Sequence, residues 1–215
     1  MNTPDTAPKK AQGTRGKARR TLILVFLTCA LPIVAALYFY LVDRPDTTNN
    51  YGTILEPQVE VPGTVFKNLA GSDFTMTSLK GKWVLVQTMA SDCDAVCQNT
   101  LFFQRQARTS KGKDQGRIER VVFVTDNGPL ETMLLRQFPD VHFVRASESE
   151  LTGWLSLQKG IVGTKGSTEV LGLRDHVFVV DPLGHVMMRF PPNAQLEFDK
   201  FRKDISRLLW ASNIG

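Results

Sequence analysis

The chain has little that would suit it to binding nucleic acids, because its excess of positive charge is confined to one short segment. Its 215 residues include 26 Lys and Arg against 21 Asp and Glu. Six of the basic residues, but only Asp5 among the acidic ones, lie in residues 1–20, which leaves 20 of each in the rest of the chain. A neutral remainder gives no basic surface for phosphate groups, and we expect no nucleic-acid partner.

Internal repeats and low-complexity tracts are also absent beyond residue 61. The composition, 42% hydrophobic and 22% charged, is typical of an ordinary globular chain with one or two domains. A chain of this length can bury a sizeable core.

Charge is missing altogether from residues 22–42. As a helix, this run is long enough to cross about 30 Å of hydrocarbon. It also exceeds the apolar core of roughly 7 to 15 residues that a cleaved signal peptide has. We therefore predict one transmembrane helix over residues 21–42, in which Cys29 is a small lipid-buried residue rather than a lipidation site.

The basic tail, residues 1–20, should lie in the cytoplasm by the positive-inside rule. The tail offers no good amphipathic transit peptide, so we expect a single-pass protein of a bacterial inner membrane with its C-terminal part in the periplasm. Residues 43–61 are polar and broken by prolines, which indicates a tether. Residues 62–215 then form the folded domain.

Short apolar runs alternate with longer amphipathic segments in this domain, a pattern that predicts an α/β fold. A small hairpin turning near Gly71 and Ser72 should precede Trp83–Met89, a strand apolar enough to be buried on both faces. The further predicted elements are a helix at 96–107, a strand at 121–125, a helix at 129–138, a strand at 141–145, a helix at 149–157, a hairpin at 176–190 turning at 182–184, and a helix at 196–210.

Cysteine is scarce, and apart from Cys29 the chain has only Cys93 and Cys97, in the stretch S-D-C-D-A-V-C-Q. This stretch follows the first central strand, at the carboxyl end where open α/β sheets place their functional crevice. A helix N-terminus favours a thiolate and should lower a cysteine pKa below its ordinary value of about 8.5. Both thiols would then be usable as nucleophiles or as metal ligands.

The spacing of this pair leaves several interpretations open. Residues four apart on a helix have Cβ atoms about 5 to 6 Å apart, so a metal ion could join the two sulfurs with little movement, whereas a disulfide requires closer approach. A structural disulfide would add little stability across so short a loop. Two incidental thiols are the third reading, and the spacing by itself mildly favours a metal.

Four stretches resemble the membrane-anchored Sco/SenC proteins of cytochrome c oxidase assembly: L-K-G-K-W-V-L-V, C-D-A-V-C-Q, V-V-F-V-T-D and D-H-V-F-V-V-D-P-L-G-H-V. The resemblance covers residues 60–210. It implies a thioredoxin-like fold, with an N-terminal β-hairpin and a preceding transmembrane helix, in which Cys93, Cys97 and His176 bind copper. Two thiolates and an imidazole are chemically suited to such a site, because thiolates are soft ligands for Cu(I) and imidazole suits both copper oxidation states.

The chain departs from the family pattern at two places. Asp94 and Gln98 stand where the family has prolines, and T-D-N-G-P is shorter than the family's acidic excursion. These departures are typical of a divergent member and could alter the redox potential, metal affinity or choice of partner.

Other soft or titratable residues are better explained as structural. Neighbouring methionines on a strand point to opposite faces and cannot both reach one ion, while two acidic residues near His176 could orient it or cap the hairpin. The residues considered in this way are His142, His185, Met187, Met188, Asp175 and Asp181.

Three classes of function fit this sequence. The first is a copper-binding factor that assists copper-site assembly in a copper-dependent oxidase subunit, its client. The second is a membrane-tethered thiol:disulfide oxidoreductase in which Cys93 and Cys97 form the redox-active pair, although C-x-x-C would be the more natural spacing. The third is a non-catalytic scaffold. A peroxidase is disfavoured because no T-x-x-C context precedes Cys93.

Overall fold

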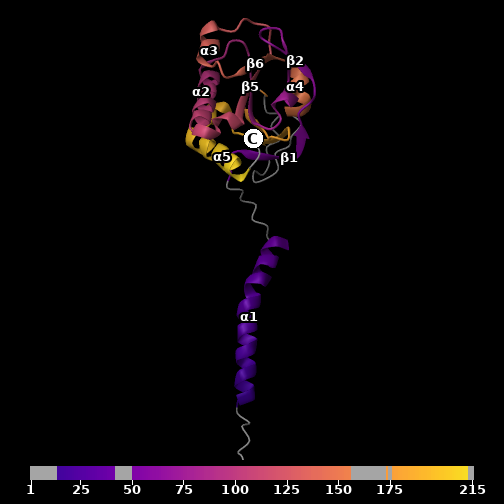
Figure 1. Cartoon of the computed structure of the whole chain (residues 1–215), viewed down its shortest axis with the longest axis vertical. Coiled ribbons are helices and arrows are strands. Elements are labelled where there is room, and N and C mark those ends of the chain that lie inside the picture. The colour runs from indigo at the N-terminus through magenta and orange to yellow at the C-terminus, as the bar shows by residue number, and fades with distance from the viewer. Residues whose placement is uncertain (1–13, 42–49, 156–172, 174–175, 213–215) are drawn as a thin grey trace, which may run out of the picture. The chain divides into compact units, whose positions relative to one another are not determined.

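The computed structural model describes residues 14–41, 50–155, 173 and 176–212. The chain divides into two compact units, Met1–Thr47 and Thr48–Gly215. The first contains a single long helix among its described residues, and the second is an α/β domain built on one sheet (Figure 1).

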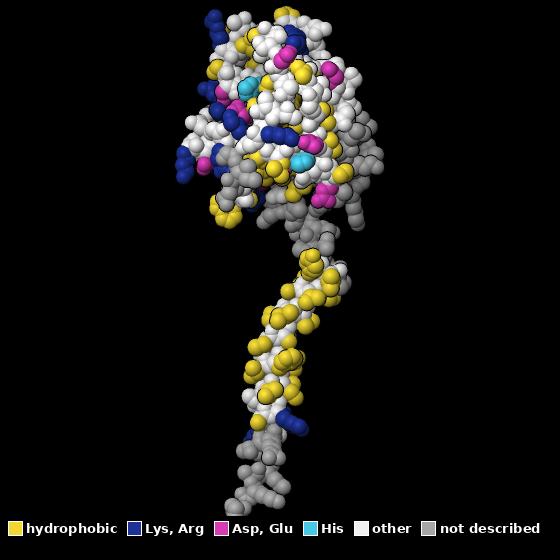
Figure 2. Space-filling view, turned by 45° about the vertical axis from the view of Figure 1, so that its right-hand side comes forward, with side chains coloured by type: hydrophobic (Ala, Val, Ile, Leu, Met, Phe, Trp, Pro, Cys, Tyr) yellow, Lys and Arg dark blue, Asp and Glu magenta, His cyan; other side chains and the backbone are white. Residues whose placement is uncertain are grey.

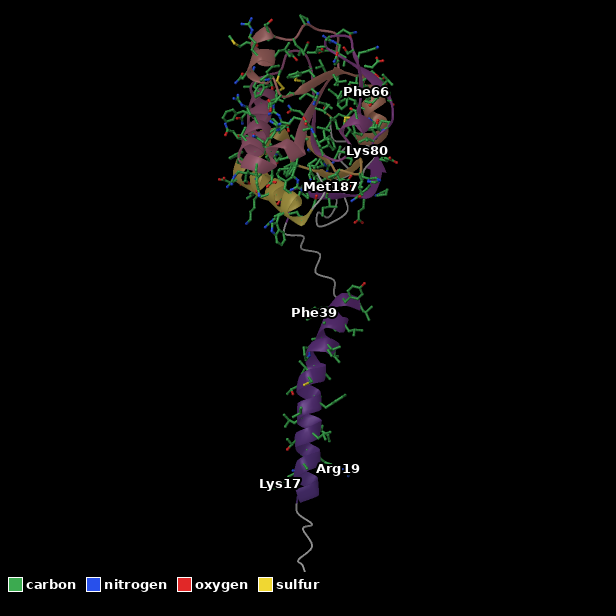
Figure 3. All side chains as sticks on the ribbon, viewed as in Figure 1. Lys17, Arg19, Phe39, Phe66, Lys80 and Met187 are labelled. Atoms are coloured by element: carbon green, nitrogen blue, oxygen red, sulfur yellow. A yellow bond between two sulfur atoms is a disulfide. The ribbon has the colours of Figure 1, made fainter. Side chains whose placement is uncertain are left out.

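Helix α1 (Thr14–Leu41) is long and apolar enough to cross a membrane. Its 28 residues extend about 42 Å at 1.5 Å per residue. Figure 2 shows apolar side chains along its length, and Figure 3 places Lys17 and Arg19 near one end and Phe39 near the other. The hydroxyl of Thr28 donates to the Val25 carbonyl, so this polar group is satisfied within the helix. The helix predicted at 21–42 is thus present, and begins earlier in the chain.

The second unit is organised around an eight-stranded mixed sheet with the order β1-β8-β7-β4-β5-β6-β2-β3. Strands β4, β5 and β6 are parallel, and β7 runs antiparallel to β4. A hairpin of β2 and β3 extends the sheet at one edge, and β8 and β1 extend it at the other. The strands are β1 (Thr53–Glu60), β2 (Val65–Asn68), β3 (Asp73–Thr75), β4 (Trp83–Met89), β5 (Ile118–Val124), β6 (His142–Arg145), β7 (Val177–Val180) and β8 (His185–Arg189).

Every residue of β4 is buried, as its apolar sequence predicts, because helices cover both faces of the sheet. On one face lie α2 (Ala95–Thr109) and α5 (Phe198–Ala211), which run close together in Figure 1, and Phe103 of α2 contacts Phe198 of α5. The remaining helices are α3 (Thr132–Gln137), α4 (Glu148–Leu155) and the 3₁₀ turns η1 (Met76–Leu79), η2 (Gly112–Arg117) and η4 (Asn193–Gln195).

The opposite face of the sheet is covered by α4, whose Trp154 and Leu155 pack into one core cluster with Val86 of β4 and Phe178 of β7. On the α2 side, Leu101 packs with Met89 in another core cluster. Complete burial of a Leu or Phe side chain contributes about 1.5–3 kcal/mol, so these two apolar layers supply most of the driving force that holds β4 at the centre.

Two segments differ from the sequence predictions. The tether predicted at 43–61 is wrong for residues 53–60, which form β1. Leu55 is fully buried, and the backbone pairs with β8 on either side of an irregularity that accommodates Pro57. The helix predicted at 129–138 begins only at Thr132, because Arg145 donates to the carbonyls of Asp126 and Gly128 and holds the preceding chain as a loop.

Candidate functional site

The cysteine pair lies where β4 passes into α2, at the carboxyl edge of the parallel strands. The β4 strand ends at Met89, and α2 begins at Ala95 with Asp94 as its N-cap. The Asp94 carboxylate accepts the Cys97 backbone N–H at 2.8 Å, which satisfies a donor that the helix start would otherwise leave open. This position agrees with the sequence prediction.

Cys93 and Cys97 form a disulfide with their Cα atoms 5.3 Å apart. That separation lies inside the usual disulfide range of about 4.4–6.8 Å. The disulfide shows that the two sulfurs can approach closely at this spacing, whereas the expectation of a wider separation treated both residues as part of one helix. Cys93 precedes the N-cap, and the turn between the two residues brings the sulfurs together.

The two departures from the family prolines also have local roles. The side chain of Gln98 donates to the Cys93 carbonyl at 3.1 Å, and its backbone N–H donates to the Asp94 carbonyl at 2.9 Å. A proline at position 98 would remove the second of these bonds. Asp94 and Gln98 therefore hold the turn that carries the disulfide.

Cys97 faces inward and meets two residues of β4. Its sulfur lies 3.6 Å from the Met89 sulfur and 3.7 Å from the Gln87 side-chain nitrogen. The Gln87 oxygen accepts a 2.6 Å hydrogen bond from Gln104 on α2, and neither glutamine is exposed at all. Neither glutamine was predicted as a site residue, although a single glutamine inside the apolar run W-V-L-V-Q-T-M is a visible signal.

Cys93 packs against the same core cluster as Cys97 and also lines a pocket with a volume of about 450 Å³. Asp92, Gln98, Leu130 and Glu131 are among the residues that line it. The pocket therefore offers apolar surface and polar groups directly beside one sulfur of the disulfide.

The wall of this pocket is tied to β5 through Asp126. Its carboxylate accepts hydrogen bonds from the backbone and the hydroxyl of Ser91. Gly128 allows the two loops to approach, since a Cβ at that position would stand 2.0 Å from the Ser91 hydroxyl oxygen. These hydrogen bonds from the loop after β5 thus hold the backbone beside Cys93 in place.

Beneath the site, Arg120 anchors α2 to the sheet. Its side chain is completely buried, donates to the Leu101 carbonyl at 3.2 Å and forms a 3.0 Å ion pair with Asp140. Burial lowers the pKa of Arg120 to about 10, although the Asp140 carboxylate opposes that shift. The guanidinium still carries its charge at neutral pH, and its bond to the helix backbone helps hold α2 under the disulfide.

His176, the predicted third ligand, stands immediately before β7 and is 2% exposed. Its Nδ1 donates to the Phe190 carbonyl at 2.7 Å, and its ring contacts Phe178 edge-on. Val177 pairs with Gln87, so those two side chains share the α2 face of the sheet. Since neighbouring strand residues alternate, His176 and Phe178 lie on the opposite face.

Copper fits part of this arrangement. Reduction would turn the two cysteines into soft thiolate donors suited to Cu(I). Within the described residues, however, no group of three or more His, Cys, Asp or Glu side chains is placed to hold a metal ion. The ligand set Cys93, Cys97 and His176 therefore stays a prediction.

The other candidates lie apart from the cysteines. His142 is 3.3 Å from Glu119 and stacks on Phe74. Asp181 accepts the backbone N–H groups of Leu183 and His185, and so caps the second hairpin. Met188 is buried in the core with Met187 packed against the same cluster, and Asp175 lies outside the described residues.

Comparisons with known proteins agree with this fold. Apo Sco1 from Thermus thermophilus is 21% identical, with a TM-score of 0.55, and the match covers 74% of this chain and 97% of that one. Copper-bound ScoI from Arabidopsis thaliana is 11% identical, with a TM-score of 0.53 and coverage of 72% and 100%. A putative protein disulfide isomerase from Bacteroides thetaiotaomicron is 19% identical, with a TM-score of 0.51 and coverage of 75% and 94%.

These likenesses confirm the predicted thioredoxin-like fold, and the Sco/SenC structures that the motifs pointed to are among the similar ones. No curated protein sequence matches the chain. Residues 83–212 match a family described as the transmembrane-like, thioredoxin-like, C-terminal domain. With α1, that match fits a single-pass membrane protein. The chain belongs to this family of transmembrane-like, thioredoxin-like C-terminal domains.

Proposed function

We propose that the chain is a membrane-tethered thiol:disulfide oxidoreductase whose Cys93–Cys97 pair alternates between a disulfide and a dithiol. The observation that carries the proposal is the disulfide at the N-terminus of α2, with one sulfur facing a pocket and the other held against β4. A disulfide that closes so short a loop adds little stability, which favours a chemical role over a structural one. The similar fold of a putative disulfide isomerase supports the same chemistry.

The two cysteines have different tasks in this proposal. In the reduced protein, the Cys93 thiolate attacks a disulfide of the partner, forms a mixed disulfide and releases one partner sulfur as a thiolate that takes up a proton. The Cys97 thiolate then attacks the Cys93 sulfur, which releases the second partner sulfur and closes the Cys93–Cys97 disulfide. The partner gains the two electrons that the pair loses, and a dithiol protein on the same side of the membrane must reduce the pair again.

The assignment of Cys93 as the attacking residue follows from access. Cys93 lines the pocket, whereas Cys97 packs inward on Gln87 and Met89. In the purified full-length chain in detergent, Cys93 in a Cys97→Ser variant should therefore react faster with an alkylating reagent than Cys97 does in Cys93→Ser. Faster reaction of Cys97 would reverse the two roles.

The client that we propose is a copper-dependent oxidase subunit whose cysteines must be reduced before they take up metal. The motifs shared with Sco/SenC proteins support this choice, as does the similar fold of BsSco, which is described as a member of the Sco family of cytochrome c oxidase assembly proteins and as having a disulfide switch. The same motifs support a location in a bacterial inner membrane, with α1 as the anchor and the cysteines in the periplasm.

Copper binding is the second candidate function, and the soft donors favour it. The reduced Cys93 and Cys97 would supply two thiolates to Cu(I), and His176 is the predicted third ligand. The hydrogen bond from Nδ1 to the Phe190 carbonyl would leave Nε2 as the coordinating atom of that histidine.

Anaerobic copper titration of the reduced full-length chain tests this second function, with X-ray absorption reading the number of sulfur ligands. His176→Ala should weaken retention of Cu(II) more than that of Cu(I), since the two thiolates remain for the softer ion. If the spectra of wild type and His176→Ala are the same in both oxidation states, the histidine is not a ligand. If the reduced wild type binds no copper, the chain acts through thiol exchange alone.

A further inference from the structure

A pair of buried glutamines lies directly beneath the disulfide. Gln87 stands in the middle of β4 and Gln104 on the facing side of α2, and both are completely buried. Burying an amide group costs free energy unless all of its hydrogen bonds are replaced. Here the replacement is incomplete, because the Gln104 oxygen accepts no hydrogen bond from any of the residues that the structure describes.

An apolar pair would fit this position with less cost, since the neighbouring β4 residues on the same face, Leu85 and Met89, are apolar. The glutamines are therefore poorly explained by core packing. They are better explained by what lies at the end of the hydrogen-bond chain, which is the sulfur of Cys97.

The orientation of the two side-chain amides gives that chain a direction. The Gln104 nitrogen donates to the Gln87 oxygen at 2.6 Å, so the Gln87 amide has its oxygen toward α2 and its N–H group toward Cys97, with 3.7 Å between nitrogen and sulfur. A donated N–H bond is weak toward a neutral disulfide sulfur and much stronger toward a thiolate, because hydrogen bonds to charged groups are shorter and roughly twice as strong.

We propose that Gln87 and Gln104 are positioning residues that hold an N–H donor against Cys97 and stabilise its thiolate once the disulfide opens. Gln104 acts through Gln87, since the bond that it donates polarises the Gln87 amide and fixes its orientation. The effect belongs to the step in which Cys97 must be a thiolate in order to attack the mixed disulfide on Cys93. This inference rests on the proposed redox function of the pair.

Two consequences can be measured. The glutamine chain favours the reduced protein, so its removal should shift the equilibrium of the pair with glutathione toward the disulfide. It also favours the charged form of Cys97, so its removal should raise the pH at which Cys97 becomes reactive. A hydrogen bond to a charged group contributes enough to predict a shift of about tenfold in the equilibrium constant and about one pH unit in the reactivity midpoint.

The experiment uses the full-length chain in detergent with three variants. Gln87→Leu removes the donor, Gln104→Leu removes its support, and Gln106→Leu changes a glutamine on the same helix that lies outside the chain of hydrogen bonds. The glutathione equilibrium is measured for each, and the pH profile of Cys97 alkylation is measured in a Cys93→Ser background. Thermal unfolding of the oxidised variants monitors the fold.

We expect Gln87→Leu to shift both quantities by the amounts given above, Gln104→Leu to shift them in the same direction but less, and Gln106→Leu to match wild type. The double variant Gln87→Leu/Gln104→Leu should give the same two values as Gln87→Leu alone, because Gln104 acts only through the Gln87 amide. A purely structural role would change the unfolding temperature but leave the alkylation profile in place.

Wild-type values of both quantities in Gln87→Leu would overturn the inference and leave the redox function intact. If Gln87→Leu does not fold, wild-type values in Gln104→Leu overturn it in the same way. If the wild-type pair does not exchange with glutathione at all, the proposed function fails and this inference fails with it.

Discussion

Substitutions at Asp94, the N-cap of α2, can separate its effect on folding stability from the effect of its negative charge on the cysteines. The Asp94 carboxylate accepts the Cys97 backbone N–H at 2.8 Å, and no other acidic residue lies in the first turn of α2. Replacing an N-cap aspartate with alanine typically costs about 1 kcal/mol, whereas serine is an equally good cap. Asp94→Ala should therefore lower the free energy of unfolding by about 1 kcal/mol, and Asp94→Ser should change it by a few tenths at most.

For a domain of this size, 1 kcal/mol corresponds to a decrease in Tm of about 2–4 °C. The assay is thermal unfolding of the full-length protein in detergent, with the two variants compared in the same redox state. Both substitutions remove a negative charge beside the cysteines, so both should also speed alkylation of the reduced pair at fixed pH, because a neighbouring carboxylate disfavours a thiolate. Equal loss of stability in the two variants would refute the capping argument.

Three further results are expected. Burial tends to raise the pKa of Glu119, but hydrogen bonds and charge from Lys82 and His142 together lower it more, so the folded-state pKa lies below the ordinary 4.5. The stabilisation by ionised Glu119 is therefore complete above pH 4.5 and is lost as pH falls through the folded-state pKa. The difference in unfolding free energy between wild type and Glu119→Gln should shrink over that pH range, and an unchanged difference at lower pH would contradict the assignment. Gly128→Ala should destabilise the fold by about 1–3 kcal/mol, because its Cβ would overlap Ser91, while Gly116→Ala, which meets no atom within 4 Å, should be nearly neutral. Finally, a membrane-impermeant thiol reagent should label the reduced cysteine pair in intact spheroplasts, and protection until the membrane is broken would reverse the predicted orientation.

Much of the fold could be predicted from sequence, because its central elements have strong patterns. The strand at Trp83–Met89 is predicted with its observed bounds, because its run of mostly apolar residues is typical of a strand buried on both faces. Strand β1 was missed because its exposed residues and Pro57 make it resemble a linker, and only pairing with β8 reveals its role. Edge strands of this kind depend on a distant partner, which local periodicity does not contain.

The position of the cysteine pair could be predicted from the sequence, but the disulfide between the two cysteines could not. The pair Cys93 and Cys97 was placed correctly at the start of a helix, yet whether the sulfurs meet depended on which residue begins that helix. The helix predicted at 96–107 already leaves Cys93 outside it, but the argument from spacing treated the two cysteines as residues i and i+4 of one helix, whereas Cys93 precedes the Asp94 N-cap. His176 was selected by motif resemblance, and its burial on the opposite face of the sheet depends on the register of β7, which the motif does not specify.

The most direct test of the account is to look for the mixed disulfide in cells that contain the copper-dependent oxidase. A Cys97→Ser variant lacks the resolving sulfur, so Cys93 should remain joined to the partner and give an adduct on a non-reducing gel that disappears after reduction. A Cys93→Ser variant of equal abundance is the matched control and should give none. An adduct that contains the oxidase subunit, formed only by Cys97→Ser, is the predicted result. Absence of any adduct from Cys97→Ser, with oxidase activity retained in both variants, would contradict the central claim.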